Sequence, residues 1–212
     1  KSNTTADNNT AVGWSALNQN TIGNSNIAVG REALYTNVAA DRNVALGYRS
    51  LYTMSRSTTA DTYHVAVGNE AAYSCTTGAQ SVAVGGKALY SLTTADGAVA
   101  VGYEAAKDWV GSYSITAIGY LALANCTTGV NNTALGRNSL TTLTTARENT
   151  ALGNMSMQSA TTAYENVAVG SNSLYTITTG ANNTALGHNA LYTNNASSCT
   201  AVGKDALKLN TC

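Results

Sequence analysis

The sequence of 212 residues contains no proline and no phenylalanine, and only 10 % of its residues are charged. An average globular domain is about a quarter charged, so we expect a surface that is polar without being ionic. Eleven basic residues balance eleven acidic residues. A neutral chain has no long-range attraction for nucleic acid or for an anionic membrane surface, and we expect neither as a partner.

Long apolar runs are also absent. No run approaches the roughly 20 residues that a membrane-spanning helix needs, so we expect no membrane insertion in this segment. The two histidines, His64 and His188, lie far apart in the sequence, without a cluster of cysteines or carboxylates spaced for a metal. No residue pair has the arrangement of a nucleophile and its base. The sequence therefore predicts no enzyme, no cofactor and no metal site.

The sequence is rich in one repeated phrase. The triplet Ala-aliphatic-Gly occurs twelve times, and nine of the eleven intervals between its glycines are 17 residues long. One interval is 21 residues and the last is 16. We interpret residues 1–212 as a single repeat domain. Its units are centred on Gly13, Gly30, Gly47, Gly68, Gly85, Gly102, Gly119, Gly136, Gly153, Gly170, Gly187 and Gly203.

The length and composition of the unit indicate its fold. A unit of 17 residues is too short for a helix-turn-helix repeat, which takes about 34. The residues before each glycine alternate as β-branched, Ala and aliphatic, which is typical of a strand, and the glycine permits a sharp corner. We therefore predict an all-β fold, a parallel β-solenoid of about twelve 17-residue coils. Equivalent residues of successive coils then stack about 4.8 Å apart.

Within each coil the sequence predicts two strands. The first precedes the glycine, and the second is the Ala/Ser-Leu-Tyr-Thr run that follows it. We expect the aliphatic residue before the glycine and the Leu after it to fill the interior between two narrow sheets. A second apolar column lies seven residues after the glycine, so a bend must separate it from the Leu column. At least one of the columns of Ala and of Ala/Ser is expected to contact another subunit; the alternative is packing against the opposite wall of the same coil.

Asparagine occupies the position four residues before the glycine in seven of the twelve units. Stacked amides can bond donor to acceptor from one strand to the next, as in other stacked-strand assemblies. We predict a structural ladder at this position. Its members are Asn9, Asn26, Asn43, Asn132, Asn149, Asn166 and Asn183.

Two features are candidate surface contacts. A tyrosine column five residues after the glycine could bind a glycan or a receptor, or it could simply cover the coil or pack between subunits. The second candidate contact is the insertion near residues 53–63, because loops carry function more often than scaffolds do. The alternative is that this loop is merely tolerated and has no role. The candidate residues are Arg56 and Tyr63 in the insertion and Tyr35, Tyr52, Tyr73, Tyr90, Tyr175 and Tyr192 in the column.

Cysteine and threonine leave further alternatives open. Cys75 and Cys126 share a column three coils apart, or roughly 14 Å, which is beyond the reach of a disulfide. Cys199 and Cys212 lie one coil apart and could pair. Ser/Thr-x-Thr triplets such as Ser74-Cys75-Thr76 recur in ranks that are typical of ice-binding proteins, or their hydroxyls could make the hydrogen bonds of the turns.

The pattern Asn-Thr/Val-Ala-Val/Leu-Gly-x-x-Ala/Ser-Leu, from about Asn9 to Leu207, resembles the YadA-like head repeats of trimeric autotransporter adhesins. It is equally similar to repeats of some phage tail fibres. The resemblance implies a left-handed parallel β-roll, three identical chains side by side, and an extracellular, cell-surface or virion location. The unit here is longer than is usual in those heads. No neck, stalk or anchor follows Cys212, so we expect a portion of a longer fibre and leave bacterial or phage origin open.

The sequence thus predicts a non-enzymatic structural or adhesive fibre segment that mediates attachment to a cell surface. Its expected partners are two further copies of itself, in a homotrimer, and an unidentified receptor or glycan. The alternative is an ice-binding or purely structural extracellular filament.

Overall fold

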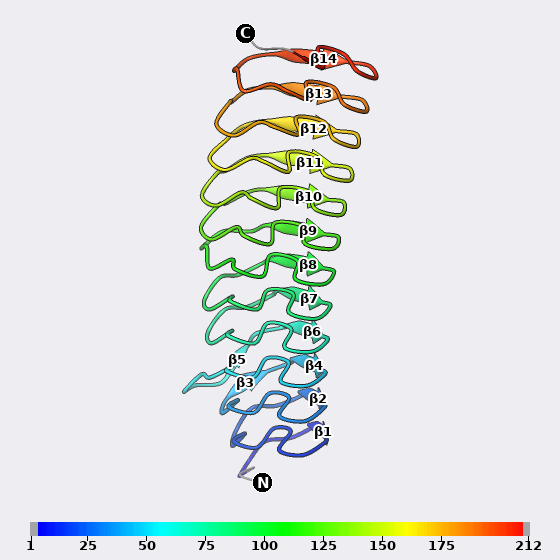
Figure 1. Cartoon of the computed structure of the whole chain (residues 1–212). Helices are drawn as coiled ribbons and strands as arrows, with labels where there is room; N and C mark the ends of the chain where they lie inside the picture. The colour runs from blue at the N-terminus through cyan, green and yellow to red at the C-terminus, as the bar shows by residue number, and fades with distance from the viewer. Residues whose placement is uncertain (1–3, 210–212) are drawn as a thin grey trace.

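The computed structural model describes residues 4–209, and all regular elements in this range are β-strands. Twelve short parallel strands stack in chain order into one long sheet, as Figure 1 shows. These strands are β1 (Thr10–Val12), β2 (Ile27–Val29), β4 (Val44–Leu46), β6 (Val65–Val67), β7 (Val82–Val84), β8 (Val99–Val101), β9 (Thr116–Ile118), β10 (Thr133–Leu135), β11 (Thr150–Leu152), β12 (Val167–Val169), β13 (Thr184–Leu186) and β14 (Thr200–Val202).

Neighbouring strands pair without a slip, so that each residue lies opposite its equivalent in the next coil. Thr133 of β10 pairs with Thr116 of β9 on one side and with Thr150 of β11 on the other. The prediction of an all-β parallel solenoid with about 17 residues per coil is confirmed. Eleven steps join the twelve strands, which at about 4.8 Å per step gives a rod about 50 Å long.

The four extra residues of the long interval leave the stack undisturbed. β4 still pairs with β6 in register, Ala45 opposite Ala66. The insertion is bracketed by two short strands, β3 (Ala40–Asp41) and β5 (Ala60–Asp61), which pair in parallel as a separate sheet. Between β4 and β5 the chain projects from the side of the rod (Figure 1). The insertion is therefore a protrusion on a continuous scaffold.

The side chains of the strands point the opposite way from the prediction. Ala134, in the middle of β10, is fully buried inside the coil, whereas Leu135 is 47 % exposed on the outer face. The interior at this level already holds Leu140 and Leu143, both fully buried. Facing them, the narrow coil has room for a methyl group and not for a larger side chain. The prediction that the aliphatic column before the glycine fills the interior is therefore wrong, and the prediction for the Leu column is confirmed.

The run after each glycine is a series of turns and not a second strand. Asn138 and Leu140 have φ angles of 55° and 50°, in the left-handed region that is uncommon for residues with side chains. The N–H of Leu140 nevertheless donates to the carbonyl of Ser156 in the next coil at 3.1 Å. The N–H of Leu143 donates to the carbonyl of Leu140 at 3.2 Å. This tight turn directs both leucines inward, which confirms the predicted bend and corrects the predicted strand.

The Ala column and the Ala/Ser column are buried inside the coil of a single chain. Ala134 and Ser139, one from each column, are both fully buried in a single chain. The prediction that these columns contact another subunit is wrong, and the alternative, packing within the same coil, is confirmed. Any contact between copies of the chain must use other residues.

Candidate functional site

The asparagine ladder predicted from the sequence lies inside the solenoid and joins each coil to the next. The Asn149 Oδ1 accepts the backbone N–H of Asn166 and its side-chain amide, both at 3.1 Å. The Asn149 Nδ2 donates to the carbonyl of Ala163, at the turn of the same coil, at 2.8 Å. Each buried amide therefore satisfies backbone groups in two coils, as buried polar atoms require.

The ladder has two runs separated by four coils without asparagine. The first run is Asn9, Asn26 and Asn43, and the second begins at Asn132. In the gap the same position holds His64, Ser81, Ala98 and Ile115. A second, shorter ladder was missed from the sequence: Asn37 donates to the Oδ1 of Asn20 at 2.8 Å from the column seven residues after the glycine. Its signal was the two consecutive asparagines in a column that is apolar from Met54 to Ile177.

His64 takes the place of an asparagine in the ladder. Its backbone N–H donates to the Asn43 Oδ1 at 3.0 Å, and its Nδ1 accepts the N–H of Ser81 at 3.3 Å. Its Nε2 lies 2.7 Å from the carbonyl of Gly78. This set of partners assigns a neutral ring with the proton on Nε2. Burial lowers the pKa of His64 below its ordinary value, which is consistent with that neutral form.

Ile115 has no polar side-chain atom and cannot form the hydrogen bonds of a ladder asparagine. A tryptophan makes one of these bonds instead. Counting along the coil, the carbonyl that an asparagine at position 115 would bind is that of Gly129. The indole Nε1 of Trp109, a fully buried side chain, donates to that carbonyl at 3.0 Å. The carbonyl is thus satisfied by a residue from the coil below. The other function of a ladder asparagine, accepting the next N–H, has no substitute here.

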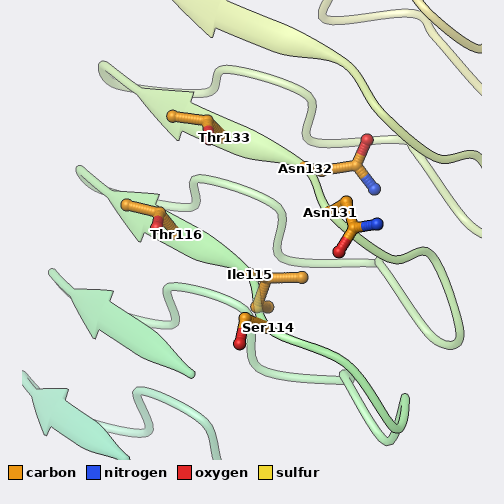
Figure 2. A pocket seen from close by; sticks show the side chains of 6 residues that line it. All are labelled: Ser114, Ile115, Thr116, Asn131, Asn132 and Thr133. Carbon is orange, nitrogen blue, oxygen red and sulfur yellow. The ribbon is translucent and has the colours of Figure 1, made fainter. Parts of the chain in front are cut away.

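A cavity of about 200 Å³ lies at this break, between the starts of β9 and β10. Figure 2 shows Ser114 and Ile115 on one coil and Asn131 and Asn132 on the next, with Thr116 and Thr133 further along the two strands. All six residues are uncharged. The cavity therefore offers hydroxyl, amide and backbone groups in a neutral setting. Its one signal in the sequence is the loss of asparagine at position 115.

Cys75 lies beside His64 without forming a reactive pair. The Cys75 Sγ is 3.5 Å from the Nε2 of His64, but burial raises the pKa of the thiol to about 12. Burial also raises the pKa of Cys126 to about 12. Both thiols stay protonated at neutral pH and are packed as small apolar side chains. Cys199 is half-buried, and its predicted pairing with Cys212 lies outside the described residues.

The tyrosine column forms stacked rings. Tyr35, Tyr52, Tyr73 and Tyr90 make one continuous stack, with ring centroids 5.1–5.2 Å apart. Tyr175 and Tyr192 make a separate pair at 4.9 Å. The rings of Tyr52 and Tyr73 have both faces covered by neighbouring rings, so they present edges and hydroxyl groups to a ligand. The geometry favours the covering role that the sequence left open.

In the insertion, Arg56 and Tyr63 are held by the scaffold. Arg56 donates to the carbonyls of Thr77 and Gly78 in the next coil, and these hydrogen bonds hold the insertion against that coil. The Tyr63 hydroxyl lies 3.0 Å from the Asp61 carboxylate, and Arg42 bonds to both groups. Tyr63 is 46 % exposed. The exposed cluster around Arg42 is therefore a fixed surface feature at the base of the protrusion.

The corners after the glycines carry a separate ladder of charge and aromatic rings. The Arg31 guanidinium lies 5.0 Å from the Trp14 ring centroid and 5.8 Å from that of Tyr48. One position further, Glu32 and Arg49 of successive coils form an ion pair. The hydrogen bond from Arg49 lowers the pKa of Glu32. Charges of alternating sign thus stack without repulsion along this edge.

The threonine ranks predicted as an ice-binding pattern are engaged within the solenoid. The Thr142 Oγ1 donates to the carbonyls of Gln158 and Ala160 at 2.7 and 3.0 Å, and the Thr76 Oγ1 donates to the carbonyl of Thr93 at 3.1 Å. These hydroxyls link one coil to the next. This is the alternative that the sequence left open, in which threonine completes the hydrogen bonds of the turns.

The outer face of the long sheet carries an aliphatic side chain on each of its twelve strands. We call it the sheet face and define it by the residues one and three positions before each glycine. The first position is Val, Leu or Ile in every coil, and the second is Ile or Val in six coils and Thr in six. Among these side chains Val12, Leu135, Leu186 and Val202 are 47–65 % exposed. Large exposed apolar patches are uncommon on monomeric proteins and are a feature of interaction surfaces in general.

Within residues 4–209 no three His, Cys, Asp or Glu side chains are grouped to hold a metal ion. No helix in this range is long and apolar enough to cross a membrane. Comparison of the chain with protein-family models, with curated proteins and with solved structures gives no match.

Proposed function

We propose that the chain is a rigid, non-enzymatic segment of an extracellular or virion fibre that takes part in attachment to a cell surface. Three copies lie side by side with their sheet faces together, each wound as a left-handed coil. The observation that carries the proposal is the column of twelve aliphatic residues on the outer face of the sheet. The resemblance of the repeat to adhesin heads and tail-fibre repeats supports the same assembly.

The sheet face is suited to a second copy by its shape and chemistry. Its side chains rise from a single sheet with in-register pairing throughout, so the ranks of two copies can pack along their full length. Burial of apolar surface stabilises an interface by about 25 cal/mol per Å². Leu135, at 47 % exposure, and its equivalents have this area available. The rest of the rod is polar and carries few charges, with basic and acidic residues in equal number, which fits a spacer that presents weak contacts repeatedly and gains from multivalency.

The mass of the protein in solution tests the assembly. Analytical ultracentrifugation should give three times the chain mass of 21.7 kDa. Leu135→Lys places an unpaired charge in the interface and should shift the protein to monomers. Val110→Lys is the matched control, because Val110 is similarly exposed at 42 % but is not part of the sheet face. A monomer for the unmodified chain would refute the trimer.

An ice-binding filament is the second candidate function. The threonines that would contact ice are those of the sheet face and not those of the Ser/Thr-x-Thr triplets. Thr116, Thr133 and Thr150 lie on the sheet face in register with one another, and their hydroxyls make no hydrogen bond among the described residues. Flat ranks of Thr and aliphatic residues are therefore present on one surface. Thermal hysteresis of a monomeric protein, lost in Thr133→Lys, would favour this candidate over the attachment fibre.

A further inference from the structure

We propose that the cavity between the starts of β9 and β10 binds one ring of a neutral saccharide. This names a ligand for the attachment role proposed above and rests on that role only for its biological meaning. The cavity shares Thr116 and Thr133 with the sheet face. Its other four residues lie outside that face, so binding and assembly can be measured separately.

The cavity lies where the asparagine ladder is interrupted and backbone N–H groups lack a hydrogen-bond acceptor. In the coil above, the N–H of Asn149 donates to the Asn132 Oδ1 at 3.0 Å. The corresponding N–H of Asn132 faces Ile115, which has no acceptor. Within residues 4–209 the backbone N–H groups of Asn132 and Ile115 have no hydrogen-bond partner, and both residues line the cavity. A buried donor without a partner destabilises the fold, so an oxygen atom from a bound molecule is favoured at this point.

The side chains around these donors match the hydroxyl groups of a sugar. Ser114, Thr116, Asn131 and Thr133 line the cavity, and their side chains make no hydrogen bond among the described residues. Hydroxyl and amide groups both donate and accept, as each hydroxyl of a sugar does. The lining contains no charged residue. A neutral polyhydroxy ligand is therefore favoured over an anion or a cation, whose charge would be unpaired there.

The size of the cavity limits the ligand further. A volume of about 200 Å³ is below the roughly 300–1,000 Å³ of sites for drug-sized ligands, and it suits a single ring. Tyr113, which precedes Ser114, is 66 % exposed and has no ring stacked on it among the described residues. Its ring is therefore not covered as those of Tyr52 and Tyr73 are, and it is next in sequence to a residue of the lining.

The chain contains a matched control for this site. Asn131-Asn132-Thr133 recurs as Asn182-Asn183-Thr184 at the same positions of another coil, and Asn131 and Asn182 have φ angles of 56° and 58°. At the second place, however, the N–H of Asn183 donates to the Asn166 Oδ1 at 2.9 Å. The two places share this triplet and its backbone conformation. They differ in the coil below, where Glu165, Asn166 and Val167 stand in place of Ser114, Ile115 and Thr116, and therefore in whether the ladder donor is open.

Saturation-transfer NMR with the methyl glycosides of glucose, galactose, mannose and N-acetylglucosamine tests the proposal on the full chain. We expect transfer to at least one of them, weakened about fivefold or more in Asn131→Ala and unchanged in Asn182→Ala. Ile115→Asn supplies the missing acceptor and should also abolish transfer, while thermal unfolding shows the variant folded. Absence of transfer to all four glycosides, equal losses in the two alanine variants, or full transfer in Ile115→Asn would each overturn the site.

The same samples separate this inference from the proposed function. A trimer that binds none of the glycosides overturns the saccharide site alone. A monomer that binds one of them, with the loss confined to Asn131→Ala and Ile115→Asn, supports the site and overturns the trimer.

Discussion

The Nδ1 of His64 accepts the backbone N–H of Ser81 at 3.3 Å, in the place where the Asn149 Oδ1 accepts that of Asn166. The Nε2 of His64 reaches the carbonyl of Gly78, as the Nδ2 of Asn166 reaches that of Gly180. An imidazole therefore reproduces both contacts of a ladder amide, but only while it is neutral. A proton on Nδ1 would set two donors against each other at Ser81.

The first prediction is that the protein loses stability in mild acid through His64. Burial lowers the pKa of His64 in the folded chain, whereas the unfolded chain takes up the proton near pH 6.5. As pH falls below about 6.5 the unfolded state binds more protons, so the free energy of unfolding decreases until the folded pKa is reached. Urea unfolding at pH 7.5 and 5.0 should show a loss of about 1 kcal/mol or more that is absent in His64→Asn.

The control for this prediction is His188→Asn, because His188 is exposed at a corner and makes no contact with the ladder. That variant should keep the full dependence on pH. If His64→Asn loses as much stability between the two pH values as the unmodified chain, the ladder role of His64 is wrong.

The second prediction concerns a complete rung of the ladder. Asn149→Ala removes the acceptor for Asn166 and the donor for the carbonyl of Ala163, and it leaves both groups buried. Unsatisfied buried groups cost about 1–3 kcal/mol each, so we expect a loss of about 3 kcal/mol in the free energy of unfolding. Asn125→Ala, an exposed position, should change it by less than about 0.5 kcal/mol. Similar losses in the two variants would contradict a stabilising ladder.

The stack itself could be predicted from the sequence, but the direction of its side chains could not. The spacing of the glycines sets the register, and the recurrence of asparagine sets the ladder. Alternation with a period of two places Ala134 and Leu135 on opposite faces, yet it does not say which face is inside. Hydrophobicity alone favours Leu135. The better guide was that Ala never varies in its column whereas the aliphatic position does, because a narrow interior limits size and an outer face does not.

The conformation of the turns and the presence of the cavity could not be predicted from the sequence, because both depend on contacts between residues far apart in it. Leu140 has a φ of 50°, a conformation that leucine rarely adopts, and only the packing of its side chain inside the coil explains it. Trp109 and Gly129 meet across 20 residues of sequence, which no local pattern indicates. The loss of asparagine at position 115 was visible, but its consequence, an open donor beside a cavity, depends on the stacking of two coils.

The third prediction is that the buried cysteines do not react in the folded protein. Burial raises the pKa values of Cys75 and Cys126 to about 12, and both side chains are fully buried. Alkylation by iodoacetamide requires an accessible thiolate. At pH 8 mass spectrometry should find both residues unmodified in the native chain and fully modified in guanidinium chloride. Rapid native modification of Cys126 would show that the interior opens at that coil.

The last prediction uses two glycines of the same column. Gly136 has a φ of 143°, and a Cβ atom there would lie 2.3 Å from the carbonyl oxygen of Gly153 in the next coil. Gly203 has a φ of 121°, but a Cβ atom there meets nothing within 4 Å. Both alanine variants carry the strain of a positive φ, about 1–3 kcal/mol. Only Gly136→Ala must also push two coils apart.

Gly136→Ala should therefore lower the free energy of unfolding by about 1–3 kcal/mol more than Gly203→Ala does, since overpacking adds that amount. Urea unfolding followed by circular dichroism measures both variants under one set of conditions. The comparison isolates the contact between coils from the conformational strain, because the two positions share the strain and differ in the contact. Equal destabilisation would mean that the glycine column is required for its backbone angles alone, and that the coils can separate slightly without loss.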